Sequence, residues 1–360
     1  MDCLHVMTAE ELRSAVSVRP GERKSGQSLR LAVDYAAEAD LQPPRLTAAL
    51  RAARQQGALF AVLGLPEDIS PRANLGRGGA HEAWSAFLQS WANLQDNRYL
   101  DYSAIVLLGS AECGDLQAQS AGADVETLRR LCAELDQRVT AIVTSIASAQ
   151  LIPIVIGGGH GGALGIIKGL VQAGEQFRRG LAAANCDPHA DYRDLEGRHS
   201  GNAFSYAHRF GWLQRYHVLG LHESYNSENM LQKMIRSGVT WISFEDIFVR
   251  GRLSWEEALR ESAEMLAAAS LPVGIECDLD CAARMPSSAM LPYGLNLREA
   301  ARYVYYMAAH LPAAYLHLAE GAPSLGADGE RCVGRALAWL TACFCKAVTE
   351  GAAHPAEAAE

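Results

Sequence analysis

The chain has 360 residues, of which 49% are hydrophobic and 20% are charged, so it can bury a sizeable core in one large domain or two. Its 41 acidic residues outnumber its 32 Lys and Arg, which gives a net charge of −9 and a pI near 5.7. This acidic balance argues against a nucleic-acid partner, because binding to phosphates requires a basic surface.

The sequence also shows no pattern typical of a membrane span or a signal peptide. No apolar run approaches the roughly 18 residues of a membrane span, and the start MDCLHVMTAEELRS lacks the basic and apolar regions of a signal peptide. We therefore expect no membrane partner and a cytoplasmic location. The nine cysteines include no C-x-x-C pair, which predicts buried thiols rather than disulfides or a structural zinc site.

Short apolar runs alternate with helical patterns along most of the chain. Residues 1–50 are polar and helix-leaning, and form an approach segment. Continuously apolar runs predict strands at 58–65, 103–109, 151–158, 179–187, 216–223, 239–243, 272–279 and 313–320. Amphipathic stretches predict helices at 124–150 and at 254–270, the second opening with a Ser-x-x-Glu capping box. The alternation predicts one α/β domain over 1–350, followed by a disordered tail at 351–360.

Polar side chains follow four of these predicted strands. They are His160 after 151–158, Asp187, His189 and Asp191 after 179–187, Asp278 and Asp280 at the end of 272–279, and Glu320 at the end of 313–320. The carboxyl ends of parallel strands meet at one edge of a sheet, and alternate residues of extended backbone point the same way. We therefore expect these side chains to converge on one site.

So many carboxylates at one edge would repel one another unless cations were bound between them. Oxygen ligands with some imidazole suit Mn²⁺ better than zinc. Two such ions, roughly 3.5–4 Å apart, can hold a bridging hydroxide that attacks an electron-poor carbon. Each motif alone is often a solvated turn or an ordinary hydrogen-bonded residue, but their joint appearance at successive strand ends predicts a dinuclear metal site.

The motifs GGGH, DPHAD, DLD and AEGAP, in this order, resemble the metal signatures of the ureohydrolases, the superfamily of arginase, agmatinase and formimidoylglutamase. The resemblance extends from residue 64 to Glu320. It implies a three-layer α/β/α fold with a central, mostly parallel eight-stranded sheet, two Mn²⁺ ions per subunit, and hydrolysis of a C–N bond in an amidine or guanidine. The implied metal ligands are His160, Asp187, His189, Asp191, Asp278 and Asp280. Asp191 would also move a proton, Glu320 would bind the cationic nitrogen, and trimers or hexamers are common in the family.

Within this superfamily the sequence is most similar to formimidoylglutamase. Arginases and agmatinases have a histidine where HSGNAF has Phe204, and PEDISPRANLGRGGA is like the N-terminal segment of formimidoylglutamases. The implied reaction is N-formimidoyl-L-glutamate plus water to L-glutamate plus formamide, in histidine degradation. Pro188 and Cys277 depart from the usual motifs.

An acidic amidine as substrate requires arginine for its carboxylates and acids for its amidinium. We expect Arg193 and Arg198 to act as a pair in substrate binding, with Arg72 and Asn202 as further contacts. Since Phe204 cannot carry a proton, His199 is the catalytic residue that we expect in its place.

Three alternatives remain open. The same metal site could hydrolyse another guanidino acid, such as guanidinobutyrate, and would then release urea. A non-catalytic arginase-like binding protein is the second, although all six ligand positions are filled. Zinc-dependent deacetylation is the third, and the paired Asp-x-Asp disfavours it.

Overall fold

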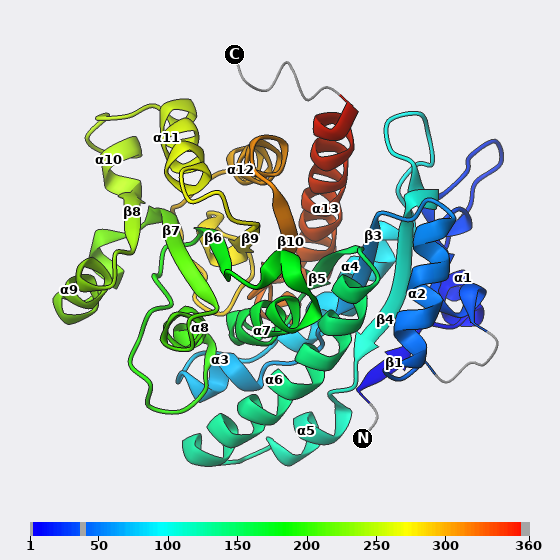
Figure 1. Ribbon diagram of the computed structural model, residues 1–360, viewed down its shortest axis with the longest axis horizontal. Coiled ribbons are helices and arrows are strands. Elements are labelled where there is room, and N and C mark those ends of the chain that lie inside the picture. Colours follow the sequence, from blue (N-terminus) through cyan, green and yellow to red (C-terminus); the bar gives the residue numbers. More distant parts are fainter. Residues whose placement is uncertain (1–2, 37–40, 354–360) are drawn as a thin grey trace.

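The computed structural model describes residues 3–36 and 41–353, which form a central sheet between two layers of helices (Figure 1). The strands are β1 (Leu4–Val6), β2 (Arg30–Leu31), β3 (Phe60–Gly64), β4 (Ile105–Ala111), β5 (Ile152–Ile156), β6 (Leu181–Cys186), β7 (Leu213–Leu221), β8 (Thr240–Ser243), β9 (Val273–Asp278) and β10 (Ala313–Ala319). Their order across the sheet is β1-β4-β3-β5-β10-β9-β6-β7-β8, with β2 beside β4.

The strands β3 to β10 pair in parallel throughout. Each of the eight predicted apolar runs overlaps one of them, with β4 ending two residues later and β7 beginning three residues earlier than predicted, so the predicted eight-stranded parallel sheet is confirmed. Two short strands add to it from the N-terminal segment, with β1 antiparallel to β4 and β2 parallel to β4. These two strands were not predicted in the helix-leaning segment, because runs of three and two residues are too short to show the two-residue alternation of side chains in a strand.

Helices cover both faces of the sheet. They are α1 (Ala9–Ala15), α2 (Arg45–Gln55), α3 (Ile69–Ala73), α4 (Ala83–Trp91), α5 (Gly114–Gln119), α6 (Val125–Ser148), α7 (Ala163–Ala173), α8 (Ala203–Arg209), α9 (Glu228–Arg236), α10 (Phe244–Phe248), α11 (Trp255–Ala267), α12 (Leu297–His310) and α13 (Gly329–Ala353). Figure 1 shows α11, α12 and α13 above the strands and α6, α7 and α8 below them. Each face has its own apolar core. The predicted capping box is present at Ser254 and Glu257, at the start of α11.

Helices α6 and α7 pack unusually closely because α7 presents glycine to its neighbour. A Cβ built at Gly169 would lie 2.8 Å from the Cβ of Val143. The hydroxyl of Thr144 donates to the carbonyl of Gly169 at 3.1 Å, and Thr140 donates in the same way to Gly165 at 3.3 Å. The missing side chains thus let α6 reach the backbone of α7.

The final helix α13 is the one described helix that is long and apolar enough to cross a membrane, over Gly329–Gly351, and 61% of that stretch is buried. It packs against α4 and α12, so its apolar character is explained by the core that it covers. The helix continues to Ala353, past the predicted start of the tail, and residues 354–360 lie outside the described part of the chain.

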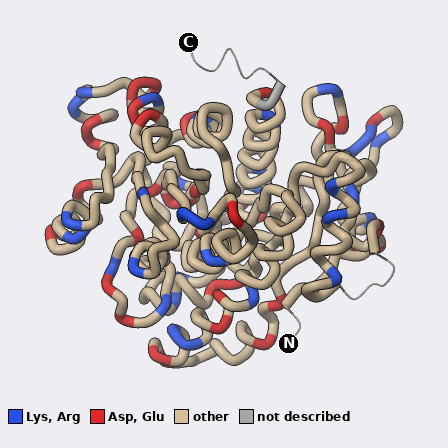
Figure 2. Tube along the Cα trace, in the orientation of Figure 1, with Lys and Arg blue, Asp and Glu red and all other residues tan. Residues whose placement is uncertain are grey.

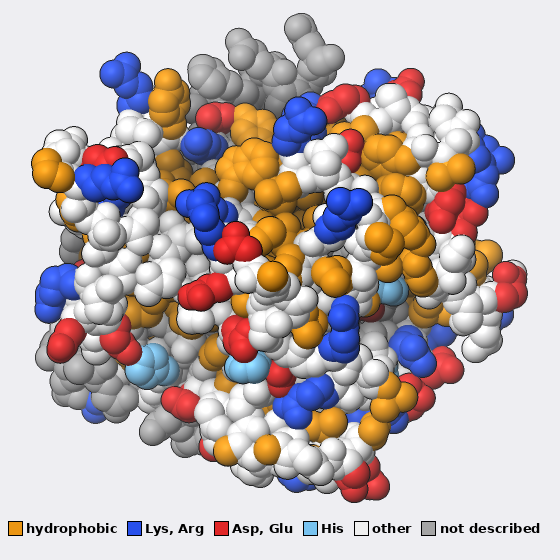
Figure 3. All heavy atoms as spheres, turned by 180° about the vertical axis from the view of Figure 1, so that it is seen from behind, with side chains coloured by type: hydrophobic (Ala, Val, Ile, Leu, Met, Phe, Trp, Pro, Cys, Tyr) orange, Lys and Arg blue, Asp and Glu red, His pale blue; other side chains and the backbone are white. Residues whose placement is uncertain are grey.

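Charged residues concentrate on the outer helices and loops, whereas most of the strands are uncharged (Figure 2). Acidic and basic side chains are interspersed over the face seen in Figure 3. Six of the cysteines are buried free thiols, as predicted, whereas Cys332 is exposed and Cys343 is half-buried. A buried group of charges is therefore conspicuous in this molecule, and such a group lies at the carboxyl ends of the central strands.

Candidate metal centre and substrate cavity

Four neighbouring strands of the sheet, β5, β10, β9 and β6, end in the residues that the sequence singled out. His160 follows β5, Glu320 follows β10, Asp278 ends β9, and Asp187 follows β6. These strands are far apart in the chain but adjacent in the sheet, so their parallel register brings the side chains together. The predicted convergence of the motifs is confirmed.

The glycines before His160 are required by the turn that carries it. Gly157 and Gly158 have φ of 85° and 72°, which is the left-handed region. A Cβ at Gly159 would lie 2.3 Å from the ring of Pro71, and its N–H donates to the buried carboxylate of Glu67 at 2.7 Å. The segment PEDISPR thus packs on the turn and fixes the position of His160.

His160 and three aspartates form the first ligand cluster. Its Nδ1 lies 3.0 Å from Oδ2 of Asp191, 3.1 Å from Oδ2 of Asp278 and 3.3 Å from Oδ2 of Asp187. All four residues are at least nine-tenths buried, with Asp191 9% exposed, and their ligand atoms are close enough together to hold a metal ion. One imidazole nitrogen and three carboxylates are a donor set that suits Mn²⁺.

A second group of side chains adjoins the first. Nδ1 of His189 lies 3.4 Å from Oδ1 of Asp187 and 3.8 Å from Oδ2 of Asp280. Backbone N–H groups orient these carboxylates, since the N–H of His189 donates to Asp187 at 2.7 Å and that of Asp280 donates to Asp278 at 2.8 Å. Asp187 and Asp278 stand between the two groups, so they could be shared by two ions.

The electrostatics of this cluster favour a bound cation. Burial and neighbouring carboxylates raise the pKa of Asp278, Asp280 and Asp191. Burial alone would lower the pKa of His160, but hydrogen bonds with Asp187, Asp191 and Asp278 raise it well above its ordinary value. The surroundings of these carboxylates therefore contain too little positive charge to neutralise them, and divalent ions would supply it.

Two residues at the site have strained backbones. Asp191 and Glu320 have φ of 45° and 65°, which is uncommon for residues with a side chain. Glu320 accepts a hydrogen bond from the N–H of His160 at 2.7 Å through Oε1, while its buried Oε2 has no partner among the described residues. Burial and the nearby Asp280 raise the pKa of Glu320 to about 8. This oxygen is therefore available to accept a hydrogen bond from a cationic or other donor group.

A cavity of about 210 Å³ opens onto these groups. Its lining comprises Pro71, Asn74, Gly76, His189, Asp191, Arg193, Ser200, Tyr225, Met230, Asp278, Asp280, Ser288, Ala289 and Glu320. A second hollow of about 270 Å³ adjoins it and shares Arg193, Tyr225 and Met230. Arg193 lines both hollows, and its guanidinium has no recorded ion pair among the described residues, so it is available to a ligand.

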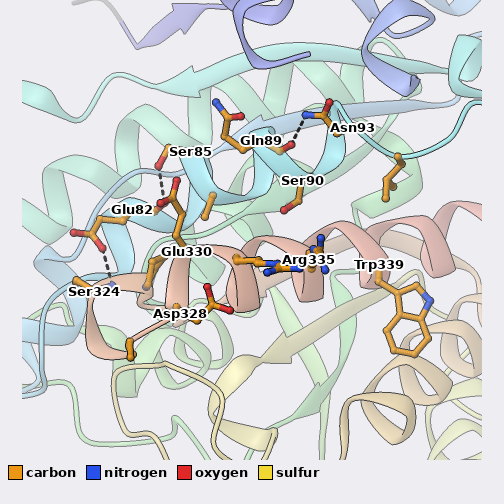
Figure 4. A pocket seen from close by; sticks show the side chains of 17 residues that line it. Glu82, Ser85, Gln89, Ser90, Asn93, Ser324, Asp328, Glu330, Arg335 and Trp339 are labelled. Carbon is orange, nitrogen blue, oxygen red and sulfur yellow. Dashed lines mark hydrogen bonds between the residues drawn. The ribbon is translucent and has the colours of Figure 1, made fainter. Parts of the chain in front are cut away.

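A larger groove, of about 1130 Å³, lies elsewhere, between α4 and the start of α13 (Figure 4). Ser85 and Gln89 line it from α4, Asn93 from the turn after α4, and Arg335 and Trp339 from α13. Among the described residues it contains no cluster of metal ligands, so its size does not make it the site of the predicted chemistry.

The expected pair of Arg193 and Arg198 is wrong in its second member. Arg198 is buried, its Nε donates to Asp136 on α6 at 2.8 Å, and its Nη2 donates to the carbonyl of Gly161 at 2.8 Å. Its Nη1 donates to Oδ1 of Asn202, whose amide donates in turn to the carbonyls of Asp194 and Gly197. Arg198 and Asn202 therefore hold the turn after His160 and their own loop in place, and neither lines the cavity.

Two further expectations also need correction. His199 is fully buried, contacts Asn202 through Nε2 at 2.9 Å, and lies outside the cavity lining, so it is not placed to serve as the proton carrier. Burial and the nearby Arg129 lower its pKa to about 4. Arg72 is held by Asp68 at 2.9 Å and by the carbonyl of Ser120 at 3.0 Å, and it does not line the cavity either.

Phe204, which marks the departure from arginase, is buried edge-on against His160 with 5.2 Å between ring centroids. Sequence reasoning missed several residues of the cavity wall, among them Asn74, Ser200, Tyr225 and Ser288. Tyr225 lies in the loop after β7, where the sequence suggested no role, and its hydroxyl is 2.6 Å from that of Tyr293. A cavity-facing polar residue in a loop carries no periodic signal, so only the fold reveals it.

Comparison with models of known protein families identifies the family of the chain. The model of the arginase family matches residues 58–345. The chain belongs to the arginase family. The resemblance found in the metal motifs is thereby confirmed at the level of the family, as is the fold that it implied.

Among curated proteins, the chain is 30% identical to the formimidoylglutamase of Aromatoleum aromaticum over 196 residues, covering 52% of this chain and 54% of that protein. It is 29% identical to that of Chromobacterium violaceum over 262 residues, covering 69% and 76%. The aligned part thus spans about half of the first relative and three quarters of the second.

Solved structures share the fold. The formimidoylglutamase of Bacillus subtilis has a TM-score of 0.69 at 16% identity, covering 94% of this chain and 98% of that one. A crystal structure of Trypanosoma cruzi formiminoglutamase with Mn²⁺ has a TM-score of 0.67 at 19% identity, covering 82% and 94%.

Proposed function

We propose that this chain is a dinuclear manganese hydrolase that converts N-formimidoyl-L-glutamate and water into L-glutamate and formamide. The observation that carries the proposal is the cavity itself, which has carboxylates and imidazole at its floor and the unneutralised Arg193 at its wall. The arginase-family match and the formimidoylglutamases among its relatives support the same reading.

The residues present fit two Mn²⁺ ions, because buried carboxylates with raised pKa values and too few positive charges surround the place where ions would lie. One ion would be held by His160, Asp187, Asp191 and Asp278, and the other by Asp187, His189, Asp278 and Asp280. When bound, the ions supply Lewis-acid chemistry and lower the pKa of water.

The protein's own groups bind and orient the substrate. The free Oε2 of Glu320 would accept a hydrogen bond from the cationic amidinium, and ionisation of Glu320 becomes favourable once that cation is close. The guanidinium of Arg193 would bind the glutamate carboxylates at the other end. The carboxylate of Asp191, on the cavity wall, can take a proton from the attacking water and give it to the departing nitrogen.

Product analysis tests the proposal. Purified protein loaded with Mn²⁺ is offered N-formimidoyl-glutamate, arginine, agmatine and guanidinobutyrate separately, and formamide, glutamate, ammonia and urea are measured. Formamide and glutamate in equal amounts from the first substrate alone is the expected result. Urea from another substrate would overturn the substrate but keep the reaction class, and inactivity on all four would favour a non-catalytic binding protein.

The cytoplasmic location and the assembly into trimers or hexamers belong to the same proposal. Analytical ultracentrifugation of the purified chain checks the assembly, and a monomer at micromolar concentration would contradict it.

A further inference from the structure

A buried polar network lies behind His160, on the side away from the aspartates. Nε2 of His160 is 3.3 Å from Oε2 of Glu276, which lies on β9. The same oxygen is 2.7 Å from Nδ1 of His317 on the neighbouring strand β10, where the two residues are register partners. The hydroxyl of Tyr315 donates to the other oxygen, Oε1, at 2.5 Å.

This network is wholly enclosed. Glu276, His317 and Tyr315 are 0% exposed. Both carboxylate oxygens of Glu276 are met by hydrogen-bonding groups, His160 and His317 at Oε2 and Tyr315 at Oε1. A buried carboxyl group is costly unless its hydrogen bonds are made, and an apolar side chain would fill the same space more cheaply. Packing therefore does not explain it.

The neighbouring backbone is adapted to this arrangement. Gly274 is the register partner of Tyr315, and a Cβ built there would lie 2.2 Å from the tyrosine ring. The missing side chain lets the ring lie across β9, so that its hydroxyl reaches Glu276. Tyr303 contributes from the helix layer, donating to the backbone carbonyl of Glu276 at 3.0 Å without contacting His160.

The two nitrogens of His160 thus face different surroundings. Nδ1 faces three aspartates, where a metal would bind, and Nε2 faces Glu276 alone. A neutral imidazole has one N–H and one lone pair, and a carboxylate that accepts the N–H leaves the lone pair at the other nitrogen.

We propose that Glu276 is a positioning residue that accepts the Nε2–H of His160, so that Nδ1 presents its lone pair to a metal ion, while His317 and Tyr315 hold Glu276 in place. The inference rests on the proposed metal centre. It assigns a role to a network that the reaction itself does not touch.

Mn²⁺ binding, measured by calorimetry and by the electron paramagnetic resonance of the bound ions, tests the inference without relying on activity. Glu276→Met removes the acceptor. We expect it to lower the affinity for one of the two ions 10- to 100-fold, the range typical for loss of such a partner. Glu276→Gln keeps an acceptor without the charge, and should weaken the same ion by less. Tyr303→Phe is the matched control, since it removes one buried hydrogen bond from Glu276 but none from His160.

The outcomes separate this inference from the proposed reaction. Should Glu276→Met fail to fold, Glu276→Gln against Tyr303→Phe decides the question. Two ions bound as tightly in the Glu276 variants as in Tyr303→Phe would overturn the positioning role alone. Selective weakening of one ion, in a protein that hydrolyses none of the four substrates, would uphold the inference and overturn the reaction. A third ion lost with Glu276 would make it a ligand instead, and a wild-type protein without affinity for Mn²⁺ would overturn both proposals.

Discussion

Arg193 is the residue on which the choice of substrate depends, because it faces the cavity with no ion pair among the described residues. Its replacement by methionine keeps a long apolar chain and removes the cation. A charge-assisted hydrogen bond is worth about 1.5–3 kcal/mol, so we expect kcat/KM for N-formimidoyl-glutamate to fall roughly 10- to 100-fold. Most of the loss should appear in KM, since the carboxylates lie away from the reacting carbon.

The same substitution at Arg178, an exposed residue after α7, controls for the loss of a positive charge. Arg178→Met should leave both constants unchanged in steady-state assays. Equal activity of the Arg193 and Arg178 variants would remove Arg193 from substrate binding.

His217 is a buried histidine outside the site, and it links stability to pH. It lies between the hydroxyls of Thr240 and Ser262, and burial lowers its pKa to about 3. In the unfolded chain the pKa is about 6.5, so between these values the unfolded state binds more protons and the native state is destabilised as the pH falls. Between pH 7 and pH 5 this costs about 2 kcal/mol of the free energy of unfolding.

Urea unfolding at pH 7 and pH 5 measures this effect. His217→Gln should be less stable at pH 7, but it should lose about 2 kcal/mol less than the wild type between the two pH values. Parallel losses in the wild type and His217→Gln would contradict the assignment.

Residue identity predicted which acidic and histidine side chains converge, because each lies at the carboxyl end of a central strand or within five residues after it. It did not predict the partner of Arg198. Asp136 is 62 residues away on α6, and no local pattern shows that the two side chains meet. Charge near a strand end therefore predicted a site, but not which arginines are already paired.

Among the elements, the contact of α6 with α7 depends most on the absence of side chains. Ala has the better helix propensity by about 1 kcal/mol, yet a methyl group at Gly169 would lie 2.9 Å from the carbonyl of Thr140. We expect Gly169→Ala to destabilise the protein by about 1–3 kcal/mol, because the two helices must move apart. Urea unfolding at fixed metal concentration measures it.

Gly351 offers the matched control at the end of α13, where the nearest atom to an added Cβ would be the carbonyl oxygen of Ala309 at 3.4 Å, an ordinary contact. Gly351→Ala should be neutral or stabilising by up to about 1 kcal/mol. If Gly169→Ala behaved in the same way, the close packing of the helices would not limit stability.

The elements themselves were largely predictable. Strands buried on both faces are continuously apolar, and long amphipathic helices repeat at 3.6 residues, so the eight parallel strands and α6 and α11 followed from the sequence. The order of the strands did not follow from periodicity, because it depends on which crossovers pack together. The three layers of the fold came from the family resemblance, whereas the order of the strands was not predicted.

At the scale of the whole molecule, the carboxylate cluster makes stability depend on metal. Ions that bind only the native state stabilise it by about 2.7 kcal/mol per site at a hundredfold excess over Kd. We expect Mn²⁺ to raise the melting temperature and EDTA to reverse the effect. Calorimetric scans of Asp278→Asn give the control, since this change removes a ligand that both ions would share and also removes repulsion.

Asp278→Asn should therefore be more stable than the wild type in EDTA and should gain little from Mn²⁺. A variant that Mn²⁺ stabilises as strongly as it does the wild type would show that the ions bind elsewhere.

The position of the ligands on four adjacent strands also determines when ions can bind during folding and when they must leave during unfolding. His160 and Asp278 are 118 residues apart in the chain, and they meet only after β10 has paired with both β5 and β9. A nascent chain cannot capture the ions early, so metal should have little influence on how fast the protein folds. Bound metal should instead slow unfolding, because the sheet cannot open at its centre until the ions leave. The half-life of the native state should lengthen accordingly.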